Sequence, residues 1–427
     1  MTTCYQRQTK RKHIQPSFNE IRHILNLAQI LAFRSIDSQF KAADLSASGS
    51  GLDLIGASNH ECKGANITPL QPLNGPRMIT FDGDQTLYSD GANFESNPEL
   101  AYYIYQLLRH GVAVAVVTAA GYEYDVEKYE LRLSGLLHYF QQHSLSEEEC
   151  ERFYLFGGEC NYLLQLKNDY HLHPVRENGP GGWSTSTKYL SDSPCNWSDE
   201  EIKCLLDGSQ ETLQQTMEEL KLKGRIVRKR RSVGLVPLPG ATITRESLDE
   251  AVLRAHERLH HMNGGCGPGI PFCAFNGGTD AWVDCGSKRV GVRILQCYLD
   301  IEPDKTLHIG DQFLNTGNDY AARAASPCVW ITNPVETKYC LKMILRLGGV
   351  PVAIPLPSDT IDRVDASNPD TDDDMAFAIE INSNSYNQST ERKGSKIDFE
   401  EIERRRASAK IMDVYTGEMV NRSATLN

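Results

Sequence analysis

The chain alternates continuous apolar runs with longer segments that contain both apolar and polar residues. Segments at 98–110, 123–143 and 288–300 are predicted to be helices. Apolar runs predict buried strands at 78–81, 112–118, 152–158, 306–311 and 327–332. Strands that are apolar on both faces and alternate with helices are typical of a parallel sheet covered on both sides. The pattern therefore predicts an α/β fold with functional residues at the carboxyl ends of the strands.

The middle of the chain, at about 173–264, has a different pattern. It contains an acidic helical start at 198–206, a helix near 209–222, the basic strand "RIVRKRRSVGLVP" and the helix "TRESLDEAVLRAHERLHHM". We interpret this segment as an α+β insert in the core. The expected division of the chain is an N-terminal helical segment at 1–75, the first part of the core at 76–172, the insert at 173–264, the second part of the core at 265–355, and a polar tail at 356–427.

Both ends of the chain differ from the core. A helix is expected to start at Ser17, which with Glu20 has the spacing of a capping box, and apolar residues follow at helical intervals. The tail is rich in polar and charged residues, so we expect it to bury little surface and to be disordered apart from a short helix at 398–409.

Composition and charge exclude several classes of protein. The 427 residues carry a net charge of −12, whereas a nucleic-acid-binding protein needs a broad basic face. The twelve cysteines include no CxxC pair, which argues against zinc-ribbon and thioredoxin-like sites. The N-terminus has no apolar signal region, and no run of about 18 apolar residues occurs that would cross a membrane. We therefore expect a cytoplasmic protein with reduced thiols that binds neither nucleic acid nor membrane.

Two aspartates follow the first apolar strand in "RMITFDGDQTLY". Asp82 and Asp84 would repel each other unless a divalent cation such as Mg²⁺ neutralised them. A carboxylate beside Mg²⁺ can attack phosphorus, and a second carboxylate two residues on can act as the acid and base. An EF-hand is excluded because Leu87 and Asn93 occupy its glycine and glutamate positions. A plain acidic turn remains the alternative for this motif alone.

Three further residues complete a pattern that favours phosphoryl transfer. Thr118 ends the second strand, where its hydroxyl and the following amides can hold a phosphate oxygen. Lys288 opens a helix and can hold a phosphoryl group. Asp311 ends the strand "TLHIG" as an expected metal ligand, with Asn315 or Asp319 as its outer helper.

With these four motifs the chain resembles the haloacid dehalogenase superfamily over about 77–345. The resemblance implies a Rossmann-like core, Mg²⁺, and a large cap at the insert. It implies that Asp82 is the nucleophile and Asp84 the acid and base. Metal binding would fall to Asp82, Asp311 and the backbone carbonyl of Asp84, and phosphoryl binding to Thr118 and Lys288.

A narrower resemblance extends from about residue 10 to 350. The strings "TFDGDQTLYSDG", "PFCAFNGGTDAWVDCGSKRVGV" and "HIGDQFLNTGNDYAAR" are similar to those of the IMP-specific 5′-nucleotidases. That family implies hydrolysis of IMP to inosine and phosphate, dependence on Mg²⁺, activation by ATP and a homotetramer. It also implies that Asp90, Asp280 and Lys288 contact the nucleotide alongside Asp82, Asp84 and Thr118. Only about sixteen residues precede the first helix, whereas members of the family carry a longer region there that takes part in effector response and assembly.

Further residues indicate how a substrate could bind, and two other classes of protein remain as alternatives. Asp280 and Asp284 are two strand positions from Trp282, so both can face a cleft. The basic strand of the insert is expected to attract a charged phosphate compound, with a solvated strand or a nuclear-import patch as the alternatives. A sugar phosphatase or phosphomutase with the same core is the alternative enzyme, and a nucleotide-binding regulator without catalysis is the alternative of another class.

Overall fold

The computed structural model describes residues 18–45, 71–89, 91–95, 97–262, 269–352, 410–412 and 419–421. Residues 1–356 form one compact unit and residues 357–427 another. In the second unit the described residues form an antiparallel pair, β12 (Lys410–Met412) and β13 (Met419–Asn421). The capping residue Ser17 and the helix expected at 398–409 lie outside the described residues. Among the described helices, none is long and apolar enough to cross a membrane.

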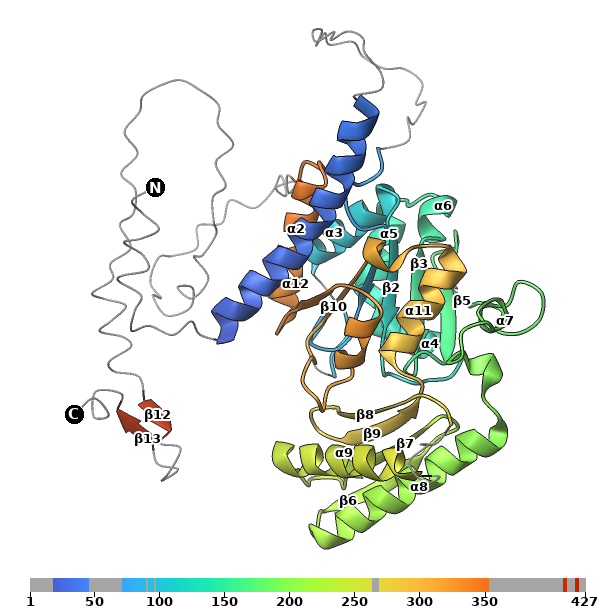
Figure 1. Cartoon of the computed structure of the whole chain (residues 1–427), viewed down its shortest axis with the longest axis vertical. Helices are drawn as coiled ribbons and strands as arrows, with labels where there is room; N and C mark the ends of the chain where they lie inside the picture. The colour runs from blue at the N-terminus through green and yellow to red at the C-terminus, as the bar shows by residue number, and fades with distance from the viewer. Residues whose placement is uncertain are drawn as a thin grey trace. The chain divides into compact units, whose positions relative to one another are not determined.

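The core is a seven-stranded sheet with the order β11-β10-β1-β2-β3-β4-β5 (Figure 1). Pairing is parallel from β11 to β3 and antiparallel for β4 and β5. The five predicted strands are confirmed, whereas β4 and β5 were not predicted. The strands are β1 (Met78–Phe81), β2 (Ala113–Val117), β3 (Phe153–Gly157), β4 (Tyr162–Leu166), β5 (Leu172–Pro174), β10 (Thr306–Gly310) and β11 (Cys328–Trp330).

Helices cover both faces of this sheet. Alternate strand residues such as Ile79 and Val114 pack with α3 and α12 in one apolar cluster. Their neighbours Met78 and Ala115 pack with α11 in another. This division follows from the period of two along a strand. The helices of the core are α2 (Phe18–Leu45), α3 (Pro98–Arg109), α4 (Val126–Arg132), α5 (Ser134–Gln142), α6 (Glu147–Cys150), α7 (Trp183–Ser186), α11 (Lys288–Leu299) and α12 (Pro334–Leu347).

The single helix predicted at 123–143 is wrong, because the chain breaks at Leu133 into α4 and α5. The backbone of residues 94–95 packs against the break. Phe94 N–H donates to the Arg132 carbonyl at 2.7 Å, and Gly135 N–H donates to the Phe94 carbonyl at 2.7 Å. A Cβ on Gly135 would lie 1.7 Å from the carbonyl oxygen of Glu95, so this close approach requires glycine.

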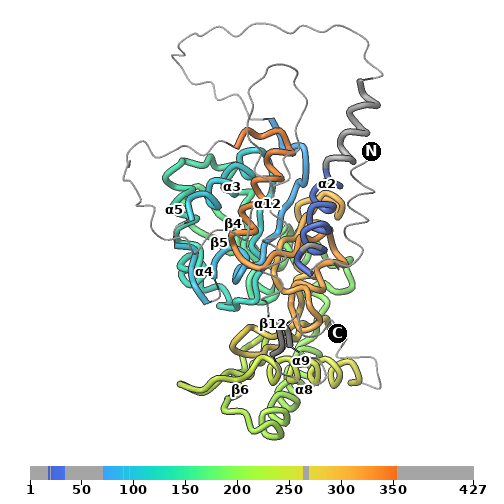
Figure 2. The backbone as a smooth tube through the Cα atoms, turned by 90° about the vertical axis from the view of Figure 1, so that its left-hand side faces the viewer, coloured from blue at the N-terminus to red at the C-terminus, as the bar shows by residue number. Residues whose placement is uncertain are grey.

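The insert forms a second, antiparallel sheet with the order β6-β7-β9-β8. Its two helices lie side by side on one face of the sheet (Figures 1 and 2). The insert consists of α8 (Asp199–Glu219), β6 (Gly224–Arg228), β7 (Ser232–Pro237), α9 (Arg245–His260), β8 (Phe272–Asn276) and β9 (Ala281–Cys285). We call it the cap.

Three predictions about the cap differ from the structure. The separate helices expected at 198–206 and 209–222 are one helix, α8, which begins at a capping box formed by Ser198 and Glu201. The single basic strand is a hairpin, because the charged residues 229–231 form its turn. The cap sheet also includes β8 and β9, which lie beyond residue 264, where the insert was expected to end.

Candidate active site

The parallel strands place three of the predicted residues at one edge of the core sheet. Asp82 follows β1, Thr118 follows β2 and Asp311 follows β10. These strands are neighbours, since β1 pairs with both β2 and β10. The carboxyl ends of parallel strands meet at the same edge, and this edge is the candidate site.

Asp82 is held in place by its neighbours. Its N–H donates to the Ile309 carbonyl at 2.9 Å, which extends the pairing of β1 with β10. Its Oδ1 accepts a hydrogen bond from Gly83 N–H at 2.7 Å and lies 2.7 Å from Nζ of Lys288. The residue Asp82 is 4% exposed. Burial raises the pKa of Asp82 well above its ordinary value, although Lys288 opposes that shift.

Lys288 is the first residue of α11 and is fully buried. Its ammonium group reaches three acceptors: Asp82 and Asp319, each at 2.7 Å, and the Asn318 side-chain oxygen at 3.0 Å. Burial lowers the pKa of Lys288, but the charges of Asp319, Asp82 and Glu159 outweigh burial, so the pKa lies above its usual range. Lys288 is therefore a fixed positive charge beside Asp82.

Asp319, rather than Asn315, is the buried acidic residue of the last motif. Asn315 is exposed, whereas Asp319 is completely buried. One carboxylate oxygen of Asp319 bonds Lys288 and lies 2.9 Å from Nε2 of His308. The other accepts from the backbone N–H groups of Asp311 at 3.1 Å and Gln312 at 2.9 Å. Burial raises the pKa of Asp319, but Lys288 and His308 hold it well below its usual range.

The donor set at this edge fits a divalent cation. Asp82, Asp311 and Asp319 can each offer one carboxylate oxygen, and these three atoms lie within 4.8 Å of one another. Oδ1 of Asp311 is buried and has no hydrogen-bond partner. Burial and then the charge of Asp319 raise the pKa of Asp311 to about 7. Oxygen ligands of this kind suit Mg²⁺, and a bound cation offsets the cost of burying their charges.

Thr118 lies beside the Asp82 turn. Its hydroxyl oxygen accepts from Ala120 N–H at 3.1 Å. A Cβ on Gly83 would be 3.3 Å from this oxygen and 2.4 Å from the hydroxyl of Tyr88. A side chain at position 83 would therefore crowd the Tyr88 hydroxyl, and two hydroxyl groups lie beside Gly83, the residue that follows Asp82.

Asp84 has a partner that the sequence did not reveal. Nη2 of Arg132 donates to both carboxylate oxygens of Asp84, at 2.6 and 2.8 Å. The Arg132 guanidinium also lies 4.8 Å from the centre of the Tyr88 ring. Arg132 is the last residue of α4, so the break before α5 is close to the residue that holds Asp84. An arginine 48 positions away carries no local signal of this role.

Glu159 is a second residue that the sequence did not indicate. Glu159 is completely buried, and its Oε1 accepts from the Asn318 side-chain amide at 2.9 Å. Asn318 in turn accepts from Lys288, so Glu159 fixes the orientation of the amide that meets the lysine. Burial raises the pKa of Glu159 to about 7, while Lys288 opposes the shift.

Asp90 and Asp280 are the two predicted nucleotide contacts outside the core motifs. Asp90 lies outside the described residues. Asp280 is half-buried in the turn between β8 and β9, just before the strand rather than within it. Nearby, Asn276 N–H donates to the Thr316 carbonyl at 2.8 Å, so β8 contacts the loop that follows Asp311. Asp284 is buried on β9, and burial raises its pKa well above the usual value.

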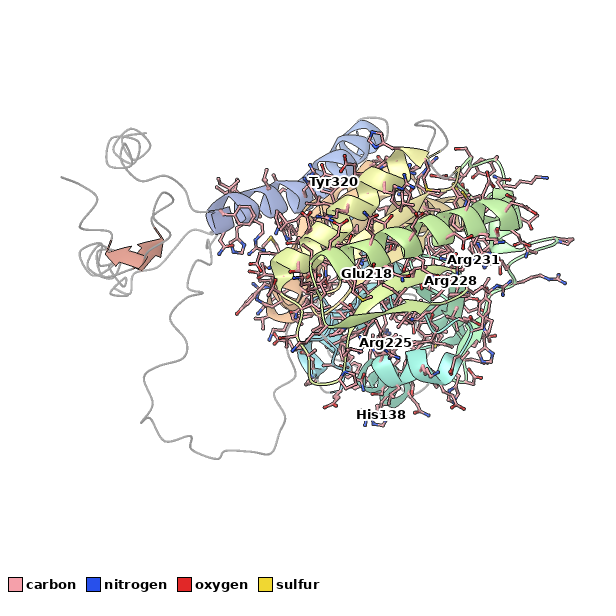
Figure 3. The ribbon with its side chains drawn as sticks, turned by 90° about the horizontal axis from the view of Figure 1, so that it is seen from below. His138, Glu218, Arg225, Arg228, Arg231 and Tyr320 are labelled. Carbon is pink, nitrogen blue, oxygen red and sulfur yellow. The ribbon has the colours of Figure 1, made fainter. Side chains whose placement is uncertain are left out.

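The basic hairpin of the cap has several partners. Figure 3 shows Arg225, Arg228 and Arg231 in a row along this hairpin. Arg228 pairs with Asp207 at 2.8 Å on α8. Lys229, in the turn, donates to the Gly121 carbonyl at 3.3 Å in the loop after Thr118. The hairpin therefore brings positive charge to the loop that follows Thr118, although part of that charge is paired within the cap.

Comparisons with known proteins show the family of this chain. The sequence profile of the IMP-specific 5′-nucleotidases matches residues 4–341. IMP-specific 5′-nucleotidase 1 of Plasmodium falciparum is 38% identical over 353 residues, which cover 80% of this chain and 67% of that protein. Its counterpart in Yarrowia lipolytica is 37% identical over 331 residues, covering 77% and 68%.

Solved structures are similar over the same region. A structure of mutant P. falciparum IMP-nucleotidase with IMP bound has a TM-score of 0.64 at 36% identity and covers 81% of this chain and 76% of that chain. An ATP-bound structure of the same nucleotidase has a TM-score of 0.60 at 36% identity, covering 81% and 68%. The predicted α/β fold of haloacid dehalogenase type is thus confirmed. The chain belongs to the IMP-specific 5′-nucleotidase family and is a phosphoric monoester hydrolase.

Proposed function

We propose that this protein hydrolyses IMP to inosine and phosphate with the help of Mg²⁺. The family supports the substrate, since a relative with a similar fold has been solved with IMP bound. The observation that carries the chemistry is the buried Asp82 carboxylate, held 2.7 Å from the Lys288 ammonium beside the Asp311 and Asp319 carboxylates. A buried nucleophile, a fixed cation and a carboxylate cluster together match the needs of phosphoryl transfer.

The first half of the reaction transfers the phosphoryl group from IMP to Asp82. Lys288 and Thr118 hold the phosphoryl oxygens, and an oxygen of Asp82 attacks phosphorus. The bond from phosphorus to the ribose 5′-oxygen breaks, and Asp84 donates a proton to that oxygen so that inosine leaves. The product of this half is an aspartyl-phosphate on Asp82.

The second half regenerates the enzyme. Asp84, now ionised, accepts a proton from a water molecule as its oxygen attacks phosphorus. The bond between phosphorus and the Asp82 oxygen breaks, which releases phosphate and restores both carboxyl groups. Positioning and neutralisation of charge supply most of the rate in reactions of this type.

Mg²⁺ would bind Asp82, Asp311 and the backbone carbonyl of Asp84, and it supplies neutralisation of the charge on the transferring phosphoryl group. Asp311 has a free buried oxygen for this purpose. The oxygens of Asp319 already face Lys288, His308 and two backbone N–H groups. Asp319 therefore acts as the outer residue that orients Asp311 and Lys288.

The proposal also covers recognition of the nucleotide and regulation by ATP. Asp90 and Asp280 contact the nucleoside part of the substrate, and Lys288 and Thr118 its phosphate. ATP acts as an allosteric activator in a homotetramer, as the resemblance implies, and an ATP-bound structure of a relative supports binding of that nucleotide. Initial rates at several IMP concentrations, with and without ATP, together with the mass in solution, test this part.

The main test is phosphate release from a panel of nucleoside and sugar monophosphates, with Mg²⁺ or with EDTA. Release from IMP above all others, abolished by EDTA, supports the proposal. Replacing Asp82 with asparagine keeps the shape and removes the nucleophile, so turnover should fall by about 10⁴-fold or more. Near-normal turnover of Asp82→Asn, or preference for hexose phosphates, would contradict it.

A further inference from the structure

The outer edge of the core sheet is capped by side chains of α2. Among the strands that the structure describes, β11 is at the edge of the sheet and pairs with β10 on its inner side. The Asn26 side chain donates to the Trp330 carbonyl at 2.5 Å and accepts from Trp330 N–H at 2.9 Å. Asn26 is 7% exposed. One amide side chain therefore satisfies the two backbone groups of Trp330 as a neighbouring strand would.

Arg22, one turn before Asn26, adds a third hydrogen bond to the same residue. Its Nη1 donates to the Trp330 carbonyl at 2.8 Å, and both terminal nitrogens bond Glu336 of α12, at 2.5 and 2.8 Å. Arg22 is 3% exposed, and Glu336 also accepts from Thr332 N–H. Figure 1 shows α2 alongside α12. The backbone of Trp330 is thus held by a buried, charge-assisted network.

The side chain of Trp330 extends this contact to the active site. Its indole Nε1 donates to the Asp311 carbonyl at 2.8 Å. The N–H of Asp311 is bonded to Asp319, so the two backbone polar groups of Asp311 are both held by side chains. The Asp311 backbone directs its carboxylate, whose Oδ1 is the buried oxygen without a partner.

We infer that Asn26 and Trp330 are positioning residues for cation binding. Asn26 of α2 holds Trp330, which is 304 positions away in the sequence, and the Trp330 indole holds the backbone of the ligand Asp311. This inference rests on the proposed function, in which Asp311 is a ligand of Mg²⁺. Substitution of a residue that orients a metal ligand commonly changes metal affinity, although that residue does not touch the metal. A merely structural role for α2 would instead change stability and leave cation affinity unaltered.

Two variants separate these roles. Trp330→Phe keeps an aromatic ring beside Phe18 and Phe313 but removes the indole donor. Asn26→Leu keeps a similar volume but leaves the Trp330 backbone groups without partners. The matched control is Lys338→Met, which breaks a 2.6 Å ion pair between α12 and Glu99 of α3 and touches neither Trp330 nor Asp311.

The measurement is titration calorimetry of Mg²⁺ into the full chain without substrate, with thermal melting of each variant as a check on folding. We expect the dissociation constant for Mg²⁺ to rise about tenfold in Trp330→Phe and in Asn26→Leu, at the low end of the losses typical of outer partners. Asn26 and Trp330 both act through the contact between Trp330 and Asp311. In the double variant the dissociation constant for Mg²⁺ should therefore rise by much less than the product of the two single-variant increases. Lys338→Met should bind Mg²⁺ like the parent chain.

Three outcomes would overturn the inference. Unchanged Mg²⁺ affinity in a folded Trp330→Phe would show that the indole bond does not position Asp311. An equal loss in Lys338→Met would show a general effect of helix packing. If the parent chain itself binds no Mg²⁺, the cation site of the proposed function fails, and the inference fails with it. The first two results leave the proposed function standing, so the failures are distinguishable.

Discussion

Arg132 offers a sharp test of the acid and base role proposed for Asp84. Its guanidinium holds the Asp84 carboxylate through hydrogen bonds of 2.6 and 2.8 Å and lies over the Tyr88 ring. Replacing Arg132 with methionine keeps most of the aliphatic side chain and removes the guanidinium. We expect the Asp84 carboxylate to lose its fixed orientation, while Asp82 and Lys288 keep their mutual contact.

The size of the effect follows from the geometry. A hydrogen bond to a charged group contributes roughly 1.5–3 kcal/mol. The side chains of Arg132 and Asp84 are 14% and 31% exposed, so solvent weakens the pair. We therefore assign about 1.5–3 kcal/mol to both bonds together. Each 1.36 kcal/mol or so is a factor of ten in rate, which gives a loss of about 10- to 150-fold. General acid catalysis contributes roughly 10²–10⁴-fold, so the loss lies within what Asp84 can supply.

The assay compares two leaving groups. The constant kcat/KM reports formation of the aspartyl-phosphate, in which Asp84 protonates the departing oxygen of IMP. The nitrophenolate of 4-nitrophenyl phosphate departs without that proton, so its kcat/KM should fall by less than about threefold in Arg132→Met. The matched control is Arg109→Met, since Arg109 also lies over a tyrosine ring and pairs with a carboxylate, Glu149, away from the site. Equal losses for the two substrates would refute the role assigned to Arg132.

Three further perturbations test other parts of the structure. Lys288→Met leaves Asp82 and Asp319 buried without the lysine ammonium group. The free energy of unfolding in EDTA should therefore fall by about 3–5 kcal/mol, and an unchanged melting temperature would contradict this. Gly135→Ala forces the residue 94–95 backbone to move and should cost roughly 1–3 kcal/mol, whereas the control Gly75→Ala, whose nearest neighbour is 3.5 Å away, should be nearly neutral in chemical denaturation. Burial raises the pKa of Glu336, but its bonds to Arg22 lower it below the usual value overall. The stability that Glu336 provides is therefore present above the ordinary glutamate pKa and lost as the pH falls through the lowered one, so melting curves of Glu336→Gln and the parent should converge in acid and differ at neutral pH.

Much of the fold and the core of the site were predictable from local pattern. A run such as Met78–Phe81 is apolar on both faces, so it can only be a central strand, and alternation with helices makes the sheet parallel. Parallel strands bring their carboxyl ends together, which places Asp82, Thr118 and Asp311 at one edge without any knowledge of long-range contacts. The motifs around these residues indicated the family, and the family comparison confirms it.

The predictions that were wrong or undecided concern residues whose structure depends on neighbours distant in the chain. The pattern at 123–143 is helical throughout, and only the backbone of residues 94–95 against Gly135 breaks it. The apolar periodicity of the basic strand does not show where its charged residues turn. The sequence offered Asn315 as the outer helper with Asp319 as the alternative, and burial beside Lys288 selects Asp319.

Local pattern in the sequence predicted the class of fold, and short motifs predicted Asp82, Lys288 and the acidic residues as candidates for the site, because strand ends bring such residues together. The residues that hold these side chains in place became visible only from contacts between distant parts of the chain. Arg132 meets Asp84, Glu159 meets Asn318, and Asn26 meets Trp330 across separations of 48, 159 and 304 residues. Such pairings depend on how helices pack against the sheet, and a single side chain far along the chain gives no periodic signal of its partner.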